Sequence, residues 1–369
     1  MPRKQKGRKR KSVRKMLTFT GFTARVMMSV MAALLLLSFL ALVANPARVW
    51  FFTLFGLLFI PLLIVNFLLL LWALKRRSKT FVIPLVAILP SFFFIGDYFR
   101  VSGTPDLQPS RDSSLKIVSY NIGRFRQGSK EFNDRDLCID SLFAFLNRQD
   151  ADVICLQEFY IKDLNRLKPF LSKHLKGYKA EYFLFDSRYG NFGNITLSKL
   201  PVIGKGVIRF DGSANLSLYT DHRYKDRKIR IYNCHFESYN ISLTGLLRSV
   251  LNRNKDEIMV VEKKMESGIK RRPKQVQQVL EHIAASPLEA IVCGDFNDNP
   301  MSYTYTKLMK GRKDTFREAG RGFSATYKPL WPFVRIDYIL CPDEMTPCRH
   351  TTPRVPFSDH YPVVATIGW

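Results

Sequence analysis

Two long uncharged apolar segments near the start of the chain constrain its fold more than any other feature. Residues 26–44 and 49–74 contain no charged side chain. As α-helices, both are long enough to cross a hydrocarbon core of about 30 Å. We predict two membrane spans. The second segment follows the first at once and no convincing small-residue cleavage motif precedes it, so we expect a permanent anchor rather than a cleaved signal peptide.

A third apolar segment covers residues 80–96, and it is shorter. It has 17 residues and contains Pro84 and Pro90, each of which removes a helix hydrogen bond. The segment is either a third span or a re-entrant or interfacial element.

The distribution of Lys and Arg predicts the orientation of these segments. Nine basic residues lie between Arg3 and Lys15 and four more lie within residues 75–79, whereas Arg48 is the only one between the first two spans. The positive-inside rule places the N-terminus and residues 75–79 in the cytoplasm. Three spans would then put the rest of the chain on the extracytoplasmic side, and two spans would leave it inside.

The net charge of +26 is unevenly divided. Residues 1–100 hold 16 Lys and Arg against Asp97 alone, so the remainder carries a net charge of +11. This excess suits a polyanionic substrate such as nucleic acid, or an anionic lipid surface. A solvated basic surface near phospholipid headgroups explains it equally well.

The chain divides into four parts. We predict a basic N-terminal segment (1–20), a membrane region with two to three helices (21–100), a linker rich in Gly, Pro, Ser and Asp (101–115) and a globular domain (116–369). In the last part, short runs rich in Val, Ile, Phe and Tyr alternate with helical patterns, one with Leu137, Leu142, Phe145 and Leu146 and one with Val276, Val279, Leu280 and Ile283. Helices followed by buried strands with polar ends indicate an α/β sandwich whose site lies at the strand ends.

Residues 240–275 interrupt this pattern as an insertion, with nine basic and four acidic side chains among apolar ones. The stretch is either amphipathic, lying on the membrane or gripping substrate, or a solvated mixed-charge helix or loop.

All six cysteines follow residue 100. Cys155, Cys234 and Cys293 lie in apolar strand-like runs, where free cysteine is a common core residue. Cys341 and Cys348 flank a short loop and are candidates for a disulfide if the domain is exported.

Polar residues end or follow six strand-like runs. Each one alone has an ordinary explanation as a turn former, a solvated acid or a structural histidine. The set comprises Asn121 in SYNIG, Glu158 in CLQE, His235 in YNCHFES, Asp295 and Asn297 in CGDFNDNP, Asp337 in RIDYIL, and Asp359 with His360 in FSDH.

As a group, these side chains suit phosphoryl chemistry. Carboxylate and amide oxygens are hard ligands for Mg²⁺ or Mn²⁺, a carboxylate can orient and deprotonate water, and histidine can donate to phosphate oxygens. No protein nucleophile with a paired base stands out. Direct attack by water is therefore favoured.

The ordered blocks SYNI, LQE, GNITLSKLPV, NCHFES, GDFND, RIDYIL and SDHYPV resemble the endonuclease/exonuclease/phosphatase superfamily, which includes DNase I. The resemblance covers about residue 116 to the C-terminus. It implies a four-layer α/β sandwich, in which two packed, mostly antiparallel sheets are flanked by helices, and a divalent-metal-dependent phosphoesterase.

The resemblance also implies roles for the polar residues. Glu158 would be the principal metal ligand, assisted by Asn121, with Asp359 near the same or an alternative metal position. The resemblance further implies that Asp295 would orient or deprotonate the attacking water, that Asn297 would help to place water and phosphate, and that His360 would contact the phosphate, oriented by Asp337. It also implies that His235 would stabilise the pentacovalent phosphate, and it places Arg188 and Asn194 where family members often shape the substrate cleft.

Three substrate classes remain open, namely nucleic acid, a phospholipid or sphingolipid headgroup, and a soluble phosphate ester. Because His235 takes the place of the tyrosine of abasic-site endonucleases, it argues mildly against dedicated DNA repair.

The alternative function is a catalytically silent binding or sensor domain on a membrane anchor. The completeness of the residue set argues against it. A transporter or channel is disfavoured because the spans are almost free of polar side chains apart from Asn66.

Overall fold

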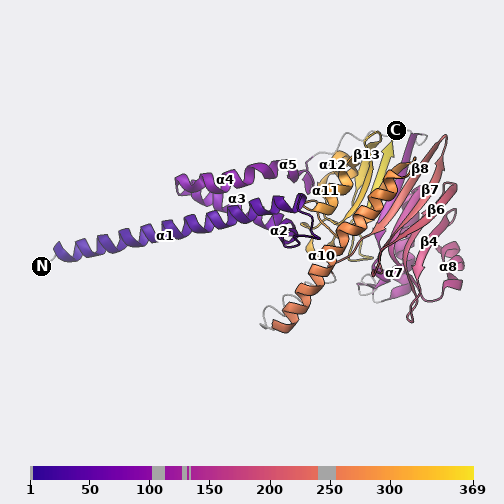
Figure 1. Ribbon diagram of the computed structural model, residues 1–369, viewed down its shortest axis with the longest axis horizontal. Helices are drawn as coiled ribbons and strands as arrows, with labels where there is room; N and C mark the ends of the chain where they lie inside the picture. The colour runs from indigo at the N-terminus through magenta and orange to yellow at the C-terminus, as the bar shows by residue number, and fades with distance from the viewer. Residues whose placement is uncertain (1–2, 102–112, 127–130, 133, 240–254) are drawn as a thin grey trace.

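An elongated group of helices at the N-terminus projects from a larger domain of sheets and helices (Figure 1). The computed structural model describes residues 3–101, 113–126, 131–132, 134–239 and 255–369. The predicted linker at 101–115 and the first part of the insertion at 240–275 therefore lie largely outside the described residues.

Two six-stranded sheets form the centre of the domain. The first has the strand order β13-β14-β2-β3-β5-β4 and the second has β10-β12-β9-β8-β7-β6. Each is mostly antiparallel with one parallel pair, β2–β3 in the first sheet and β8–β9 in the second. The strands are β2 (Ser114–Asn121), β3 (Val153–Ile161), β4 (Lys179–Phe185), β5 (Asn191–Ser198), β6 (Val202–Arg209), β7 (Leu216–Tyr224), β8 (Arg227–His235), β9 (Glu289–Asp295), β10 (Arg312–Asp314), β12 (Asp337–Pro342), β13 (Thr346–Thr351) and β14 (Val363–Gly368).

The sheets pack face to face because their strands alternate apolar side chains between two faces. In β2, Leu115 and Ile117 pack with Ile229 and Ile291 of the second sheet, in a core that is closed to solvent. Val118 and the other residues of alternate parity point to the opposite face of the first sheet.

Helices cover the two outer faces. On the first sheet lie α7 (Arg135–Gln149) and α8 (Leu167–His174), and on the second lie α10 (Lys255–Ala284) and α11 (Tyr303–Met309); a short helix, α12 (Thr315–Ala319), precedes β11 (Gly322–Phe323). The order helix, sheet, sheet, helix confirms the predicted four-layer α/β sandwich. Leu137 is an exception to the sequence pattern, since it is 52% exposed and its neighbour Cys138 faces the core.

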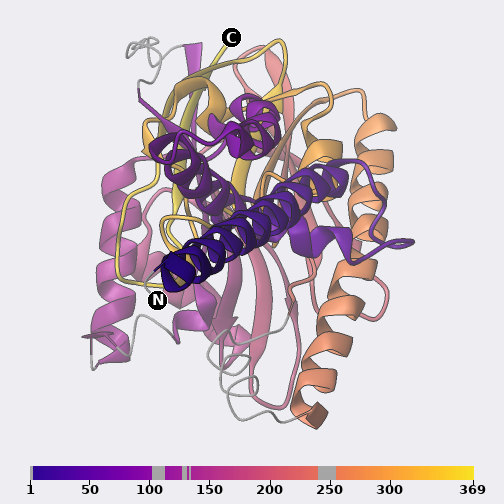
Figure 2. The same cartoon turned by 90° about the vertical axis from the view of Figure 1, so that its left-hand side faces the viewer.

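The N-terminal helices lie side by side and converge on one side of the sandwich (Figures 1 and 2). They are α1 (Arg3–Ser38), α2 (Phe52–Leu57), α3 (Phe59–Lys75), α4 (Val82–Ile88) and α5 (Phe92–Ile95). One helical stretch, Gly21–Leu42, is long and apolar enough to cross a membrane, and the helices at Phe59–Lys75 and Lys79–Ile95 are apolar but shorter.

The predicted single span at 49–74 is wrong in its start. The chain turns after residue 42, forms the short α2, and begins α3 only at Phe59. Pro61 explains the break, because its ring would clash with the carbonyl of Leu57 in a continuous helix. The third segment bends in the same way, through a 3₁₀ turn at Leu89–Ser91 that contains Pro90.

The structure also tests the candidate disulfide and the expected insertion. Cys341 and Cys348 are both buried and free, so the candidate disulfide does not form; they belong to β12 and β13, strands of different sheets. The described part of the insertion, from residue 255, merges with the predicted helix around Val276 into the single 30-residue α10, with Pro273 inside it.

A small third sheet joins the helical region to the domain. It pairs β1 (Phe99–Arg100), which directly follows the helices, with β11. The predicted domain boundaries stay a prediction, but Asp97, Phe99 and Arg100, at the end of the predicted membrane region, already contact the sandwich.

Candidate active site

The polar residues singled out in the sequence gather at one edge of the two sheets. Asn121 ends β2, His235 ends β8 and Asp295 ends β9, while Asp337 begins β12 directly opposite Asp295. Parallel neighbours end at the same edge, so β8 and β9 bring His235 and Asp295 together as cross-strand partners.

A glycine makes this close approach possible. Gly294 has φ +132°, and a Cβ atom at this position would lie 1.9 Å from the carbonyl oxygen of Cys234. No other residue can adopt this conformation at so short a distance without strain. Gly294, the glycine of the GDF motif, therefore allows β8 and β9 to approach closely at this edge.

Asp337, His360 and Asp295 form a buried acid–imidazole group. Nδ1 of His360 donates a hydrogen bond to Oδ2 of Asp337 at 2.9 Å, and its Nε2 lies 3.9 Å from Oδ2 of Asp295. Ligand atoms of the three residues lie within 4.8 Å of one another. The hydrogen bond fixes the ring so that Nε2 faces Asp295.

The charges of this group are strongly coupled. Burial alone would lower the pKa of His360, but the carboxylates of Asp337 and Asp295 outweigh it and raise that pKa to about 10. Burial, together with the charge of Asp337, raises the pKa of Asp295 to about 6, against the opposing effect of His360 and His235. A protonated imidazole beside a carboxyl group with a raised pKa is suited to proton transfer and to anion binding.

Glu158 lies beside Asn121 on the neighbouring strand β3, in a strained backbone conformation. Its φ is +50°, at the register irregularity between Leu156 and Phe159. Nδ2 of Asn121 lies 3.4 Å from Oε1 of Glu158 and donates a second hydrogen bond of 2.9 Å to Oδ2 of Asp295. Left-handed backbone at a non-glycine residue costs free energy and is concentrated at functional sites.

Asn297 follows Asp295 in a second left-handed conformation, with φ +51°. Its backbone N–H donates to Oδ1 of Asp295 at 2.8 Å, and its side-chain amide donates to the carbonyl of Phe236 at 3.0 Å. The next residue, Asp298, forms a buried ion pair of 2.9 Å with Arg272 of α10. The loop after β9 is therefore held in place on the helix side.

His235 completes the edge. Its Nε2 lies 3.9 Å from Oε1 of Glu158 and 3.8 Å from Oδ2 of Asp295. Asp359 lies half-buried beside Gly123, close enough that a Cβ there would meet Oδ1 of Asp359 at 3.1 Å. All eight residues of the predicted catalytic and metal sets thus share one edge.

The donor atoms at this edge fit a hard divalent cation. Glu158 and Asp359 offer carboxylate oxygens, the ligands that Mg²⁺ and Mn²⁺ prefer. The amide of Asn121 turns its nitrogen toward Glu158, and its oxygen accepts a hydrogen bond from the backbone N–H of Gly123 at 3.0 Å, so it would bind a cation through its second lone pair. Burial tends to raise the pKa of Glu158, but His235 and Arg124 outweigh it and lower that pKa, so the carboxylate is anionic at neutral pH.

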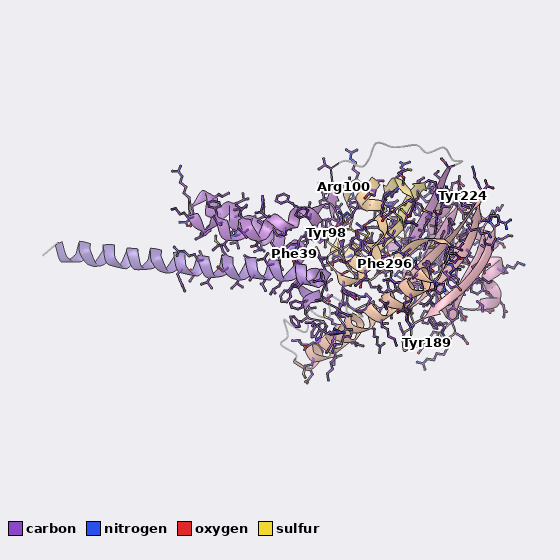
Figure 3. The ribbon with its side chains drawn as sticks, turned by 45° about the horizontal axis from the view of Figure 1, so that its top comes forward. Phe39, Tyr98, Arg100, Tyr189, Tyr224 and Phe296 are labelled. Atoms are coloured by element: carbon purple, nitrogen blue, oxygen red, sulfur yellow. The ribbon has the colours of Figure 1, made fainter. Side chains whose placement is uncertain are left out.

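Of the two residues expected to shape the substrate cleft, Arg188 lies in a surface loop and Asn194 is buried. Arg188 lies in the loop between β4 and β5, with its guanidinium stacked on the exposed ring of Tyr189, which Figure 3 shows at the lower edge of the domain. Asn194 is buried and donates to the carbonyl of Asn233 at 2.9 Å, within an amide network that joins the two sheets. Its contacts are to the protein core.

Two residues of the edge escaped the sequence analysis. Arg124 follows β2 with φ +54°, and its Nε lies 3.4 Å from Oε2 of Glu158. Tyr327 stacks edge-on against His360 at 5.5 Å between ring centroids. A basic residue soon after SYNI was a signal for Arg124, whereas nothing in the sequence around Tyr327 pointed to it.

Comparison with known proteins agrees with this geometry. The model of the endonuclease/exonuclease/phosphatase family matches residues 118–360, well over half of the chain. The chain belongs to this family. A second match, to a domain family of unknown function (DUF8431), covers residues 21–98, the helical region. A search of curated proteins found no match.

Solved structures share the family fold. The catalytic domain of human Nocturnin with bound sulfate is 18% identical, with a TM-score of 0.50 over 72% of this chain and 95% of that one. An endonuclease/exonuclease/phosphatase from Bacteroides vulgatus is 16% identical, with a TM-score of 0.51 over 69% of this chain and 98% of that one. At these identities the likeness concerns the fold.

Proposed function

We propose that the chain is a membrane-attached phosphoric ester hydrolase that depends on Mg²⁺ or Mn²⁺ and uses water as the nucleophile. The observation that carries the proposal is the convergence of eight chemically suited side chains, from strands of both sheets, on one edge. A silent binding domain has no need for the strained backbone at Glu158 and Asn297 or for the buried pairing of His360 with Asp337.

In this proposal Glu158, Asn121 and Asp359 hold the cation. When bound, it neutralises phosphate charge and polarises the phosphorus–oxygen bonds. Asp295 accepts a proton from the attacking water, which Asn297 helps to place. The carboxylate is available for this because Asn121 and the backbone of Asn297 orient its two oxygens.

His360 and His235 act on the phosphate. The Asp337 carboxylate keeps His360 in one orientation with Nε2 facing the site, so the imidazolium can donate to a phosphate oxygen as negative charge develops. His235 stabilises the pentacovalent phosphate from the β8 side. One phosphorus–oxygen bond forms to water, the ester bond breaks, and the departing alcohol oxygen takes up a proton.

The helical region supplies the membrane attachment. We propose that α1, α3 and the α4–α5 segment cross the bilayer together, because all three lie side by side and run between the domain and the far end of the bundle (Figure 1). The basic N-terminus would then be cytoplasmic and the catalytic domain extracytoplasmic.

The test uses the full chain in lipid nanodiscs with bis-p-nitrophenyl phosphate as a generic ester. We expect hydrolysis with Mg²⁺ or Mn²⁺, none with EDTA, and loss of turnover in Glu158→Gln. The matched control is Glu181→Gln, which removes a carboxylate from β4, outside the catalytic edge.

Folded protein that hydrolyses neither this ester nor plasmid DNA, RNA or phospholipid with any divalent metal would sink the proposal and favour the binding-module alternative.

A further inference from the structure

The helical region is locked to the catalytic domain through a buried polar joint. Asp97, which follows α5, is 1% exposed; its carboxylate lies 3.2 Å from Nε of Arg317, and its carbonyl accepts hydrogen bonds from Arg335 at 3.0 Å and from Ser324 at 2.8 Å. Arg335 also pairs with buried Asp314. Figure 3 shows Tyr98 at this junction, between the bundle and the sandwich.

A second contact locks the other side of the bundle. The side-chain amide of Asn299 donates to the carbonyl of Gly56 in α2 at 2.9 Å, and Met301 packs among apolar residues of the helices. A Cβ at Gly56 would lie 2.3 Å from the carbonyl oxygen of Met301, so the two segments touch. The helices therefore contact the domain on two sides.

Both contacts are made by segments that carry catalytic residues. Asn299 follows Asp295 by four residues, and Arg335 precedes Asp337 by two. Because a residue spans at most about 3.5 Å of chain, the Cα atom of Asp295 lies within about 14 Å of that of Asn299. The active site is therefore held close to the end of the apolar helices.

A row of exposed aromatic side chains extends from the same junction. Phe99 and Phe323 face each other across β1 and β11 at 5.0 Å between ring centroids, and Trp331 follows at 5.8 Å from Phe323. With Phe333 these residues form the aromatic rim, and their exposed fractions lie between 38% and 49%. Arg354 stacks on Trp331 at 4.9 Å.

The aromatic rim reaches the catalytic edge through its own loop. Trp331 lies four residues after Tyr327, whose ring contacts His360 and whose neighbour Lys328 donates its backbone N–H to the carbonyl of Asp359 at 2.8 Å. The aromatic rim therefore adjoins the catalytic edge along this loop.

The surroundings of the aromatic rim favour lipid as its partner. Aromatic rings with nearby Arg can also stack on nucleic-acid bases. However, Phe92 and Phe93 of α5, which are 66% and 78% exposed, lie only a few residues before Phe99 of the rim. Trp and Tyr are enriched where membrane meets water, and contiguous exposed apolar surface marks such contacts.

The first turns of α10 point the same way. Met259 and Val260 are about half exposed, and Figure 1 shows this end of α10 projecting from the domain on the side of the helix bundle. This is the described part of the insertion whose mixed apolar and basic composition suits an interfacial position.

We propose that the aromatic rim lies in the interfacial layer of the membrane and that the substrate is the phosphate diester of a lipid headgroup in that membrane. Water adds to phosphorus, one ester bond breaks, and the products are a phosphate monoester and an alcohol, with one of the two remaining in the bilayer. This inference rests on the proposed hydrolase function and names its substrate class.

The experiment compares substrates and variants in nanodiscs of phosphatidylethanolamine and phosphatidylglycerol. The substrates are the bilayer lipids themselves, the water-soluble headgroup ester glycerophosphoethanolamine, bis-p-nitrophenyl phosphate and single-stranded DNA. The variant is Trp331→Ser with Phe333→Ser. The matched control is Tyr182→Ser, because Tyr182 is also 43% exposed but lies on β4 at the far edge of the first sheet.

We expect the wild-type chain to convert bilayer lipid faster than the soluble headgroup ester. The rim variant should lose about tenfold in lipid turnover, the change that about 1.4 kcal/mol produces, with turnover of bis-p-nitrophenyl phosphate and the unfolding temperature unchanged. Tyr182→Ser should alter none of the three.

Several outcomes would overturn the inference. Hydrolysis of bis-p-nitrophenyl phosphate without any lipid product, a preference for the soluble headgroup ester, or DNA cleavage that falls in the rim variant each reject the lipid substrate while the hydrolase function stands. Hydrolysis of no ester at all rejects both.

The rim contact has a readout that needs no catalysis. Brominated lipids should quench a fluorescence component that is present in the wild type and missing from Trp331→Phe. Equal quenching of the two proteins would show that Trp331 does not meet the bilayer.

Discussion

Two buried charge clusters differ in the partners that they give their carboxylates, although Arg335 of one is only two residues from Asp337 of the other. The joint cluster contains Asp97, Asp314, Arg317 and Arg335, and the catalytic cluster contains Asp295, Asp337 and His360. In the joint cluster, arginines face the carboxylates. In the catalytic cluster a single imidazole serves two carboxylates, and Oδ1 of Asp337 is buried without a hydrogen-bond partner among the described residues.

The difference appears in the proton affinities. Burial favours a neutral Asp314, but Arg335 outweighs it and lowers the pKa of that carboxyl, whereas burial and the neighbouring Asp337 raise the pKa of Asp295 to about 6. The contrast holds for Asp314 only, because burial outweighs Arg317 and Arg335 at Asp97 and raises the pKa of that carboxyl to about 6 as well. Permanent partners hold a charge in one state and stabilise structure. A carboxylate with too few cationic partners can still exchange a proton or bind an ion, as catalysis requires.

The largest expected effect breaks the catalytic cluster alone. Asp295→Asn keeps the shape but removes the proton acceptor, so turnover of bis-p-nitrophenyl phosphate should fall about 10²- to 10⁴-fold. The unfolding temperature should stay within a few degrees of wild type. Asp343→Asn, on the exposed turn between β12 and β13, is the control and should keep full activity. Retained activity in Asp295→Asn would remove Asp295 from the mechanism.

The next effect breaks the joint cluster alone. Arg335→Met leaves the carboxylate of Asp314 buried without its cation, which should cost about 3 to 5 kcal/mol of stability. Thermal unfolding of the full chain in detergent measures this loss. Arg166→Met, at an arginine whose side chain is 84% exposed, should cost almost nothing. If Arg335→Met unfolded like wild type, the joint would not be a stabilising contact.

A third prediction contrasts two buried histidines. His222 contacts the hydroxyls of Ser198 at 3.1 Å and Thr220 at 2.8 Å, and burial lowers its pKa to about 4, while carboxylates keep His360 charged. The unfolded chain takes up a proton on His222 near pH 6.5. The stabilisation that comes from keeping His222 neutral is therefore complete above pH 6.5. As the pH falls toward 4, the free energy of unfolding drops by about 3 kcal/mol.

Unfolding midpoints at pH 7.5 and 4.5 check this prediction. His222→Gln should show a smaller loss of stability between the two values than wild type. An identical loss in both proteins would mean that His222 does not take part in the acid sensitivity.

The smallest expected effect is a loss of stability when the contact between α2 and the domain is disturbed. Gly56→Ala places a methyl group against the carbonyl of Met301, and such overpacking costs about 1 to 3 kcal/mol. Gly21→Ala is the matched control, because nothing lies within 4 Å of its Cβ position. Reconstituted protein should unfold at a lower temperature only in Gly56→Ala. Equal unfolding of both variants would show that the α2 contact is not close.

The catalytic cluster was largely predictable from the sequence, and the joint cluster was not. Motif residues at strand ends meet because neighbouring strands end together, so Asp295, His235 and Asp337 could be grouped before their distances were known. Arg335 belongs to the motif RIDYIL, but its partner Asp97 lies at the end of an apolar region, where no local pattern indicates a contact made across 238 residues of chain.

Helix breaks and side-chain directions also escaped prediction. The uncharged run at 49–74 reads as one span, and only the steric effect of Pro61 divides it. Asn194 was expected to shape the cleft, but its position on an inward-facing side of β5 commits its amide to the core. Composition records that a side chain is polar, whereas packing decides which way it points.

The pairing of β1 with β11 fastens the residues that directly follow the apolar helices to the sandwich. An enzyme on a long linker explores a volume around its anchor, and it can meet targets at many heights and angles. In the proposed membrane-attached enzyme, the reactive centre would stay at a constant height above the bilayer, so its search for targets would be confined to two dimensions and its encounter rate would be set by lateral diffusion.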